Sequence, residues 1–194
     1  MKAATSTSTH LSLASTSPRR RDLLETLGLR FDVVPVDVDE SPLPGESPRQ
    51  LVTRLAIAKA QAGSGENVLG ADTVVVLGDQ ILGKPRDAEE AVAMLLALSG
   101  KVHVVMTGVA LKSAAGTAAV VSATDVEFRE IGRDEAMRYW HSGEPGDKAG
   151  GYGIQGLGGL FVKRISGSYS GVMGLPVFET AELLKSAGIA ALSD

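Results

Sequence analysis

The chain has 194 residues, 44% of them hydrophobic, with 19 basic and 23 acidic side chains and a net charge of −4. This length predicts one domain with a substantial core, or two small lobes that share it. The absence of cysteine excludes disulfides, thiolate metal sites and a cysteine nucleophile, and the negative charge argues against binding to duplex nucleic acid or an anionic membrane.

Residues 1–9 are rich in Ser and Thr and predict a disordered tail ahead of a single domain at residues 10–190. They contain no apolar run of roughly 7–15 residues, the mark of a secretory signal, and organelle targeting is the alternative interpretation of the tail. No segment approaches the roughly 18–20 apolar residues of a membrane span. We therefore expect a cytoplasmic protein without membrane or nucleic-acid partners.

Strand and helix signals alternate along the first half of the chain. They predict a strand at 10–15, a helix at 18–28, an edge strand at 31–38 and a helix at 48–63. Ser17-Pro18 and Ser47-Pro48 are typical of helix N-termini, where serine caps and proline fits the first turn. Pro35 favours a sheet edge, because proline cannot donate a hydrogen bond to a neighbouring strand.

The second half is richer in strand signals. They predict a strand at 68–77, a tight turn into a strand at 80–82, a helix at 87–100, antiparallel strands at 102–111 and 118–128, a helix at 133–141, a glycine-rich loop at 144–159, a strand at 160–165 and a helix at 178–187. This order predicts an α/β fold in which helices flank a mixed central sheet.

Two glycine motifs fit phosphate-binding patterns only formally. Residues 78–84 match G-x-x-x-x-G-K, but Pro85 stands where a P-loop needs Ser or Thr, and residues 79–82 continue a hairpin. Residues 151–156 match G-x-G-x-x-G, but they follow a polar loop rather than a strand and lead into no helix. We reject both motifs.

The best anion site in the sequence lies at residues 13–21 (LASTSPRRR). A strand leads through Ser15 and Ser17 to a helix N-terminus, whose free N–H groups and dipole favour a phosphate. Arg19 and Arg20 add bidentate donors in the first turn, where cations oppose the helix dipole and a bound anion would relieve the conflict. The alternative is a capped helix with solvated arginines.

Acidic residues occur at two places that suit catalysis. Asp72, followed by Thr73, interrupts an apolar strand, so its carboxylate is paired, metal-bound, catalytic or on an edge facing water. Asp37, Asp39 and Glu40 follow the second strand and suit Mg²⁺ or Mn²⁺, although such clusters are commonly solvated loops.

Two lysines and one loop complete the candidates. Lys59 in the second helix and Lys84 in Gly-Lys-Pro are possible phosphate ligands, although lone lysines usually are not. The loop at 144–156 combines Asp147, Lys148 and Gln155 with five glycines, so its backbone can approach a ligand closely. The Gln155 amide both donates and accepts, as a uracil or thymine edge requires, and the alternative is a flexible surface loop.

Taken together, these stretches resemble the motifs of the Maf family of nucleoside-triphosphate pyrophosphatases. The resemblance rests on residues 13–20, 70–73, 83–85, 147–156, 167–169 and 174–180, in the family's order, and spans residues 11–187. It implies an elongated α/β body with a substrate cleft, similar to the inosine-triphosphate pyrophosphatases, a divalent cation and a homodimer. The DKAG…YGIQG form resembles the branch that acts on dTTP and UTP.

The resemblance also implies roles for single residues. Asp72 matches the proton acceptor, and Arg19, Thr73 and Gln155 match positions tied to substrate specificity. Glu40, Lys59 and Lys84 match other polar positions of the family, whose roles are less certain. Combined with the local chemistry, this assigns phosphate binding to Ser15, Ser17, Arg20, Lys59 and Lys84, metal binding to Glu40 and Asp72, and a base loop to Asp147 and Lys148. A carboxylate that binds a metal is a poor base, so the two roles of Asp72 compete.

The resemblance therefore implies a hydrolase that converts dTTP and UTP, and modified pyrimidine nucleotides, to the monophosphate and pyrophosphate. Two alternatives stay open. One is a non-catalytic nucleotide-binding regulator of septum formation in dividing cells, a role connected with the family's older label. The other is a purine-directed, inosine-type triphosphate pyrophosphatase.

Overall fold

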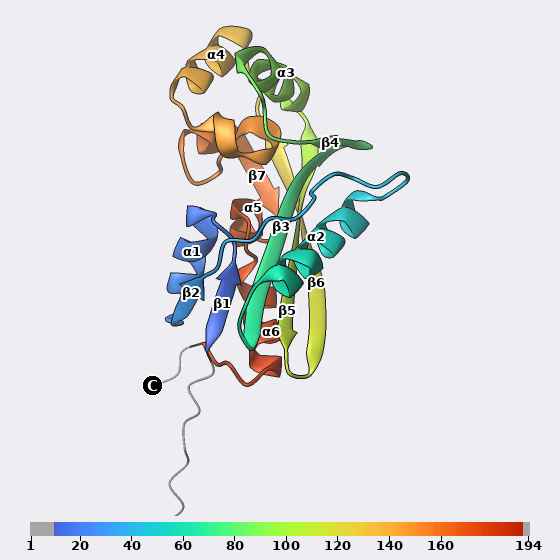
Figure 1. Ribbon diagram of the computed structural model, residues 1–194. Coiled ribbons are helices and arrows are strands. Elements are labelled where there is room, and N and C mark those ends of the chain that lie inside the picture. The colour runs from blue at the N-terminus through green and yellow to red at the C-terminus, as the bar shows by residue number, and fades with distance from the viewer. Residues whose placement is uncertain (1–9, 192–194) are drawn as a thin grey trace, which may run out of the picture.

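The computed structural model describes residues 10–191, so the tail predicted at residues 1–9 lies outside the described residues. Within this range one seven-stranded sheet runs the length of an elongated body (Figure 1). Its strands are β1 (Leu11–Ala14), β2 (Phe31–Val33), β3 (Asn67–Leu77), β4 (Gln80–Leu82), β5 (Val102–Ser113), β6 (Gly116–Phe128) and β7 (Val162–Ser166). Their order is β2-β1-β3-β5-β6-β7, with β4 also paired to β3.

The sheet is mixed, as predicted. Strand β1 is parallel to both β2 and β3, whereas β3, β5, β6 and β7 are antiparallel to one another in turn. The helices are α1 (Pro18–Glu25), α2 (Pro48–Ala62), α3 (Ala88–Leu98), α4 (Arg133–His141), α5 (Tyr169–Met173) and α6 (Val177–Ser186). Three 3-10 turns, η1 (Pro145–Asp147), η2 (Ala149–Gly151) and η3 (Leu157–Phe161), lie between α4 and β7.

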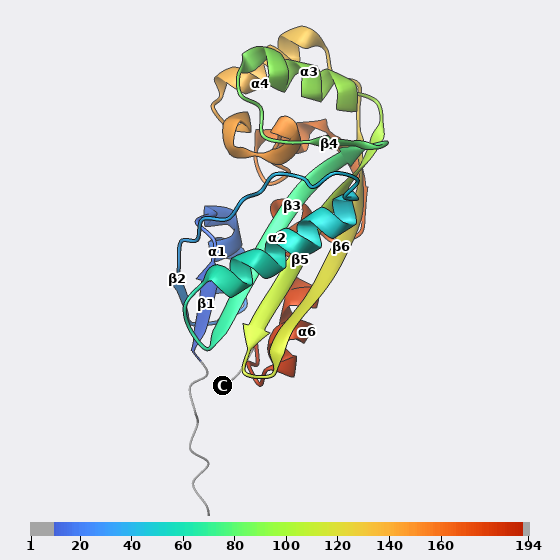
Figure 2. The same ribbon diagram turned by 45° about the vertical axis from the view of Figure 1, so that its right-hand side comes forward.

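Helix α2 crosses one face of the sheet diagonally, over β3, β5 and β6 (Figure 2). The opposite face carries two apolar clusters, because successive side chains of a strand point to opposite faces. One cluster joins α1 and α6 to the lower part of the sheet, and the other joins α3 and α4 to its upper part. The long strands connect both ends, and the described range contains no helix long and apolar enough to cross a membrane.

The structure differs from the predicted elements in three places. The strand predicted at 31–38 ends at Val33, since Pro35 has no N–H to donate, and it is an edge strand as expected. The five-residue helix α5 was not predicted, because it is too short to show a helical period. The loop predicted at 144–159 contains η1, η2 and the start of η3, which runs on to Phe161, so the strand predicted at 160–165 begins only at Val162.

Two glycines let α2 lie directly on the sheet. A Cβ atom on Gly70 of β3 would stand 2.4 Å from the Ala56 carbonyl oxygen, and one on Gly108 of β5 would stand 2.3 Å from that of Val52. Both distances are too short for any side chain, so the helix backbone rests on bare strand. This close approach sets the height of α2 above β3.

A gap interrupts one edge of β3. Strand β1 pairs with β3 up to Gly70, and β4 pairs with it only from Val75 onward. Residues 71–74 therefore have no strand on that side. The carboxyl end of β1 and the start of α1 lie beside this gap, an arrangement in which open α/β sheets bind ligands.

Candidate active site

A cleft of about 570 Å³ opens at the gap in the β3 edge. All the candidate site residues that the sequence analysis named, except Asp37 and Asp39, line it: Ser15, Ser17, Arg19, Arg20, Glu40, Lys59, Asp72, Thr73, Lys84, Asp147, Lys148 and Gln155. These side chains come from the turn between β1 and α1, from α1, α2 and β3, from the loops before α2 and after β4, and from the segment that holds the 3-10 turns. The structure thus brings together residues that are up to 140 positions apart in the sequence.

Three charged side chains of the cleft, two of them buried, form one centre. The Lys59 Nζ atom lies 2.7 Å from Oδ1 of Asp72 and 2.5 Å from Oε1 of Glu40. Lys59 and Asp72 are each 8% exposed, whereas about half of the Glu40 side chain is exposed. Burial would raise the pKa of Glu40, but the hydrogen bond and charge of Lys59 outweigh it and lower that pKa.

Local folding explains why this centre forms. Asp72 alternates along β3 with residues that face away from α2, so its carboxylate lies on the α2 face, two residues after Gly70. Lys59 lies between Ala56 and Ala60, the two residues whose backbone contacts Gly70. Of the three acidic residues predicted to form a cation site after β2, only Glu40 lines the cleft.

On the other face of β3 a guanidinium group is held entirely by uncharged oxygens. Arg20 donates from Nε to the Gly174 carbonyl at 2.8 Å, from Nη1 to Ser15 Oγ at 3.3 Å and from Nη2 to Thr73 Oγ1 at 3.2 Å. Burial lowers the pKa of Arg20, although Asp72 acts in the opposite sense. Arginine nevertheless keeps its charge, so the site presents a partly buried cation without a carboxylate in direct contact.

A chain of hydroxyl groups continues behind Arg20. Thr107 of β5, which is 1% exposed, donates to the Gly171 carbonyl of α5 at 2.7 Å and lies 2.9 Å from Thr73 Oγ1. Because the proton of Thr107 is already used, Thr73 is the donor between the two threonines. Sequence reasoning missed Thr107, although a polar residue within an apolar strand is the signal that identified Asp72.

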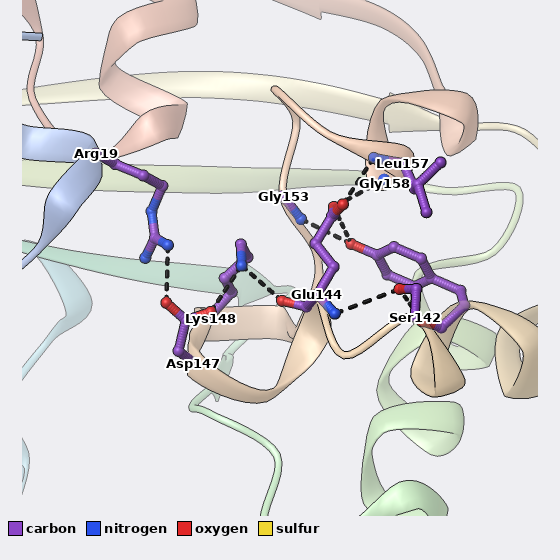
Figure 3. A network of polar contacts seen from close by, with 9 residues as sticks. Arg19, Ser142, Glu144, Asp147, Lys148, Gly153, Leu157 and Gly158 are labelled. Atoms are coloured by element: carbon purple, nitrogen blue, oxygen red, sulfur yellow. Dashed lines mark hydrogen bonds and ion pairs between the residues drawn. The ribbon is translucent and has the colours of Figure 1, made fainter. Parts of the chain in front are cut away.

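A second ion-pair network borders the cleft at the segment of 3-10 turns (Figure 3). Asp147 accepts from Arg19 at 2.8 Å and from Lys148 at 2.6 Å, and Lys148 Nζ also donates to the Glu144 carbonyl at 2.6 Å. Burial would raise the pKa of Asp147, but the hydrogen bonds from Lys148 and Arg19 lower it to about 2. These contacts tie the first turn of α1 to the predicted base loop.

The remaining candidates differ in how they are held. Ser15 Oγ accepts from the Ser17 N–H at 3.2 Å, so Ser15 shapes the turn into α1. Ser17 is the N-cap residue of α1, but its side chain makes no capping hydrogen bond. Lys84 and Gln155 are exposed on the cleft wall, and within residues 10–191 their side chains make no hydrogen bond or ion pair.

The donors available to a divalent cation are two carboxylates. No group of three or more His, Cys, Asp or Glu side chains arranged for a metal occurs in the described part of the chain. Glu40 and Asp72 contact the same Lys59 ammonium group and line the same cleft. This donor set suits Mg²⁺, which is commonly bound by one or two carboxylates together with phosphate oxygens of a substrate.

Comparisons with known proteins show which proteins this chain is similar to. The family described as "Maf-like protein" matches residues 10–187. The "dTTP/UTP pyrophosphatase" of Saccharophagus degradans is 55% identical over 185 residues, which cover 91% of this chain and 88% of that protein. The protein of the same name from Anaeromyxobacter dehalogenans is 56% identical over 182 residues, covering 92% and 94%.

Among solved structures, the Staphylococcus aureus Ham1 protein superimposes with a TM-score of 0.45 and 14% identity, over 65% of this chain and 79% of that one. This likeness is too weak to carry an argument.

Proposed function

Because the chain belongs to the Maf family, we propose that it hydrolyses dTTP and UTP to the nucleoside monophosphate and pyrophosphate. The observation that carries the proposal is the buried Asp72–Lys59 pair, which lies in one cleft with the Arg20 guanidinium, whose hydrogen bonds all go to uncharged oxygens. A triphosphate needs positive charge, and a hydrolase needs a positioned proton acceptor. Both are within reach of a single ligand in this cleft.

Arg20 is the main phosphate ligand in this proposal. A guanidinium group has five N–H donors, and three of them are used by Gly174, Ser15 and Thr73. One N–H on each terminal nitrogen is left, which is the fork that binds two oxygens of one phosphate. Lys84 and the start of α1, with Ser17, would bind other phosphates of the chain.

Asp72 is the proton acceptor. Water attacks the α-phosphorus and forms a new P–O bond, while the bond from that phosphorus to the bridging oxygen breaks. Pyrophosphate leaves with the bridging oxygen, and a proton of the water moves to Asp72. The 2.7 Å contact with Lys59 fixes the carboxylate on the β3 edge and leaves its second oxygen without a Lys59 contact. Lys59 is thus a positioning residue for the base as well as a cation near the phosphates.

A divalent cation, Mg²⁺ or Mn²⁺, completes the proposal. Glu40 would hold it. Asp72 is kept as the base in this proposal, because a carboxylate bound to a metal is a poor base. When bound, the cation neutralises charge on the phosphates and the leaving pyrophosphate.

Base recognition is assigned to the other end of the cleft. The exposed Gln155 amide offers one donor and one acceptor, which match the edge of uracil or thymine. Thr73 donates to Thr107 and accepts from Arg20, so it offers a ligand only an acceptor. Arg19, held by Asp147, stands between the phosphate site and the base loop.

The assay is turnover of a panel of dTTP, UTP, CTP, dGTP and inosine triphosphate with Mg²⁺. We expect pyrophosphate release from dTTP and UTP, and release of orthophosphate or a preference for inosine triphosphate would refute the proposal. Asp72→Asn is expected to lower kcat at least about a hundredfold, the usual scale of general base catalysis. The matched control is Asp79→Asn, in the exposed turn between β3 and β4, which should leave turnover unchanged.

Two expectations from the family resemblance belong to this proposal. A homodimer is testable by light scattering of the purified protein. Action in the cytoplasm, where nucleoside triphosphates are held, is testable by cell fractionation.

A further inference from the structure

Two side chains outside the cleft hold the backbone on both sides of Gln155. The Tyr139 hydroxyl of α4 accepts from the Gly153 N–H at 3.0 Å, two residues before Gln155. The Glu144 carboxylate accepts from the N–H groups of Leu157 at 2.8 Å and Gly158 at 3.0 Å, two and three residues after it (Figure 3). Neither Tyr139 nor Glu144 lines the cleft.

These two side chains also form a hydrogen bond with each other, in which the donor and the acceptor can be assigned. The Tyr139 hydroxyl lies 2.6 Å from Glu144 Oε1, and because a carboxylate only accepts, Tyr139 is the donor. Burial raises the pKa of Tyr139, which keeps its hydroxyl protonated. Burial would also raise the pKa of Glu144, but hydrogen bonds from Tyr139, Gly158 and Leu157 lower it, so the carboxylate is ionised at neutral pH.

The loop leaves no space around this pair. A Cβ atom on Gly156 would lie 2.3 Å from Oε2 of Glu144, and one on Gly158 would lie 2.6 Å from the Tyr139 hydroxyl. The glycines flanking Gln155 therefore allow the backbone to close on the two side chains. By contrast, the Gln155 amide itself makes no hydrogen bond within residues 10–191.

We propose that Tyr139 and Glu144 are positioning residues for base recognition: they fix the backbone on both flanks of Gln155 so that its free amide meets the base in one orientation. A free amide on a mobile loop would lose conformational entropy on binding, whereas one on a fixed backbone loses less. The Glu144 carbonyl also accepts from Lys148, so the same residue joins this loop to the network of Asp147 and Arg19. The inference rests on the proposed function for the ligand it names.

The test removes one hydroxyl. Tyr139→Phe keeps the ring that packs against Phe161 and deletes both hydrogen bonds of the hydroxyl. We expect KM for dTTP and UTP to rise about tenfold, with kcat within about twofold, as for loss of a hydrogen bond to a charged group that affects binding alone. Selectivity over CTP is expected to fall by a similar factor. Glu144→Gln should act in the same direction, since its amide nitrogen would face donors.

Two exposed positions give matched controls. Tyr169→Phe and Glu130→Gln make the same chemical changes where the side chains carry no hydrogen bond or ion pair within the described residues. Both controls should keep the KM and the selectivity of the unmodified protein. A fall in kcat with unchanged KM in Tyr139→Phe would show a general structural role and overturn the proposal, as would unchanged selectivity.

A second measurement does not depend on turnover. Amide hydrogen exchange of residues 153–158 should be faster in Tyr139→Phe and Glu144→Gln than in the unmodified protein and the two controls. Equal exchange in all variants would overturn the inference even if activity changed. An unmodified protein that hydrolyses neither dTTP nor UTP would overturn the proposed function, while the exchange measurement would still decide whether this pair fixes the loop.

Discussion

Gly70→Ala tests whether the close approach of α2 to β3 sets the catalytic geometry. The added Cβ would lie 2.4 Å from the Ala56 carbonyl oxygen and 2.5 Å from the Ala60 backbone nitrogen. Both neighbours are backbone atoms, so a change of rotamer cannot relieve the contact. An ordinary van der Waals contact of this kind begins at 3.4 Å, so α2 must move away from the sheet by about 1 Å.

The displaced segment carries Lys59, which stands between the two residues in collision. Its 2.7 Å contact with Asp72 would lengthen or turn, and the carboxylate would lose its fixed orientation. A misplacement of this size costs about a hundredfold in rate. The same overpacking is expected to lower the free energy of unfolding by about 1–3 kcal/mol.

The assay measures kcat for dTTP, together with urea unfolding at the same temperature to establish that the variant is folded. Gly132→Ala is the matched control, because a Cβ there meets no atom within 4 Å and the backbone φ is −87°. A folded Gly70→Ala protein with normal kcat would refute the idea that α2 positions the site through this contact. A loss of activity that only followed the unfolded fraction would refute it equally.

Two further predictions concern side chains buried behind the cleft. Burial lowers the pKa of His103 from 6.5 to about 4, so the unfolded chain takes up the proton first as pH falls, and stability present above pH 6.5 is lost toward pH 4. Between pH 7.5 and pH 5 this lowers the free energy of unfolding by about 2 kcal/mol. Urea unfolding of His103→Gln should show a correspondingly smaller decrease over the same pH range, and an equal decrease in the variant and the unmodified protein would contradict the assignment to His103. Thr107→Val leaves the Gly171 carbonyl without its donor and frees the Thr73 hydroxyl to donate, so kcat/KM should fall about tenfold. Thr107→Ser should retain the wild-type value, and equal kinetics for the two variants would count against the hydroxyl chain.

The sequence predicted those elements whose signals are local. Ser47 caps α2 through a complete capping box with Gln50, and Asp87 caps α3, as the residue types indicate. The predicted end of β2 was wrong, because the alternation of side chains in the sequence continues to residue 38, whereas the strand ends at Val33, ahead of Pro35. The alternation of side chains shows that a segment favours a strand, but it does not show over how many residues a neighbouring strand pairs with it.

The sequence predicted which residues line the site but not which of them contact one another. Asp72 stands out because a charge in an apolar strand needs an explanation, yet nothing in the sequence pairs it with Lys59, since that pairing depends on how closely α2 approaches Gly70. The Tyr139–Glu144 pair was missed for a related reason. Both residues are ordinary in a helix and a loop, and they matter only because the chain folds back so that residues 153–158 pack on them.

The gap in the β3 edge has a consequence for solubility. Unpaired strand edges invite other chains to add a strand, which is a route to aggregation, and proteins usually cover or blunt them. The open part here spans only residues 71–74, about 13 Å of strand. An incoming strand of ordinary length, about five or six residues, would run into β1 at one end and β4 at the other. The protein thus keeps backbone and side chains of β3 open to a small ligand while the edge stays too short to template another chain.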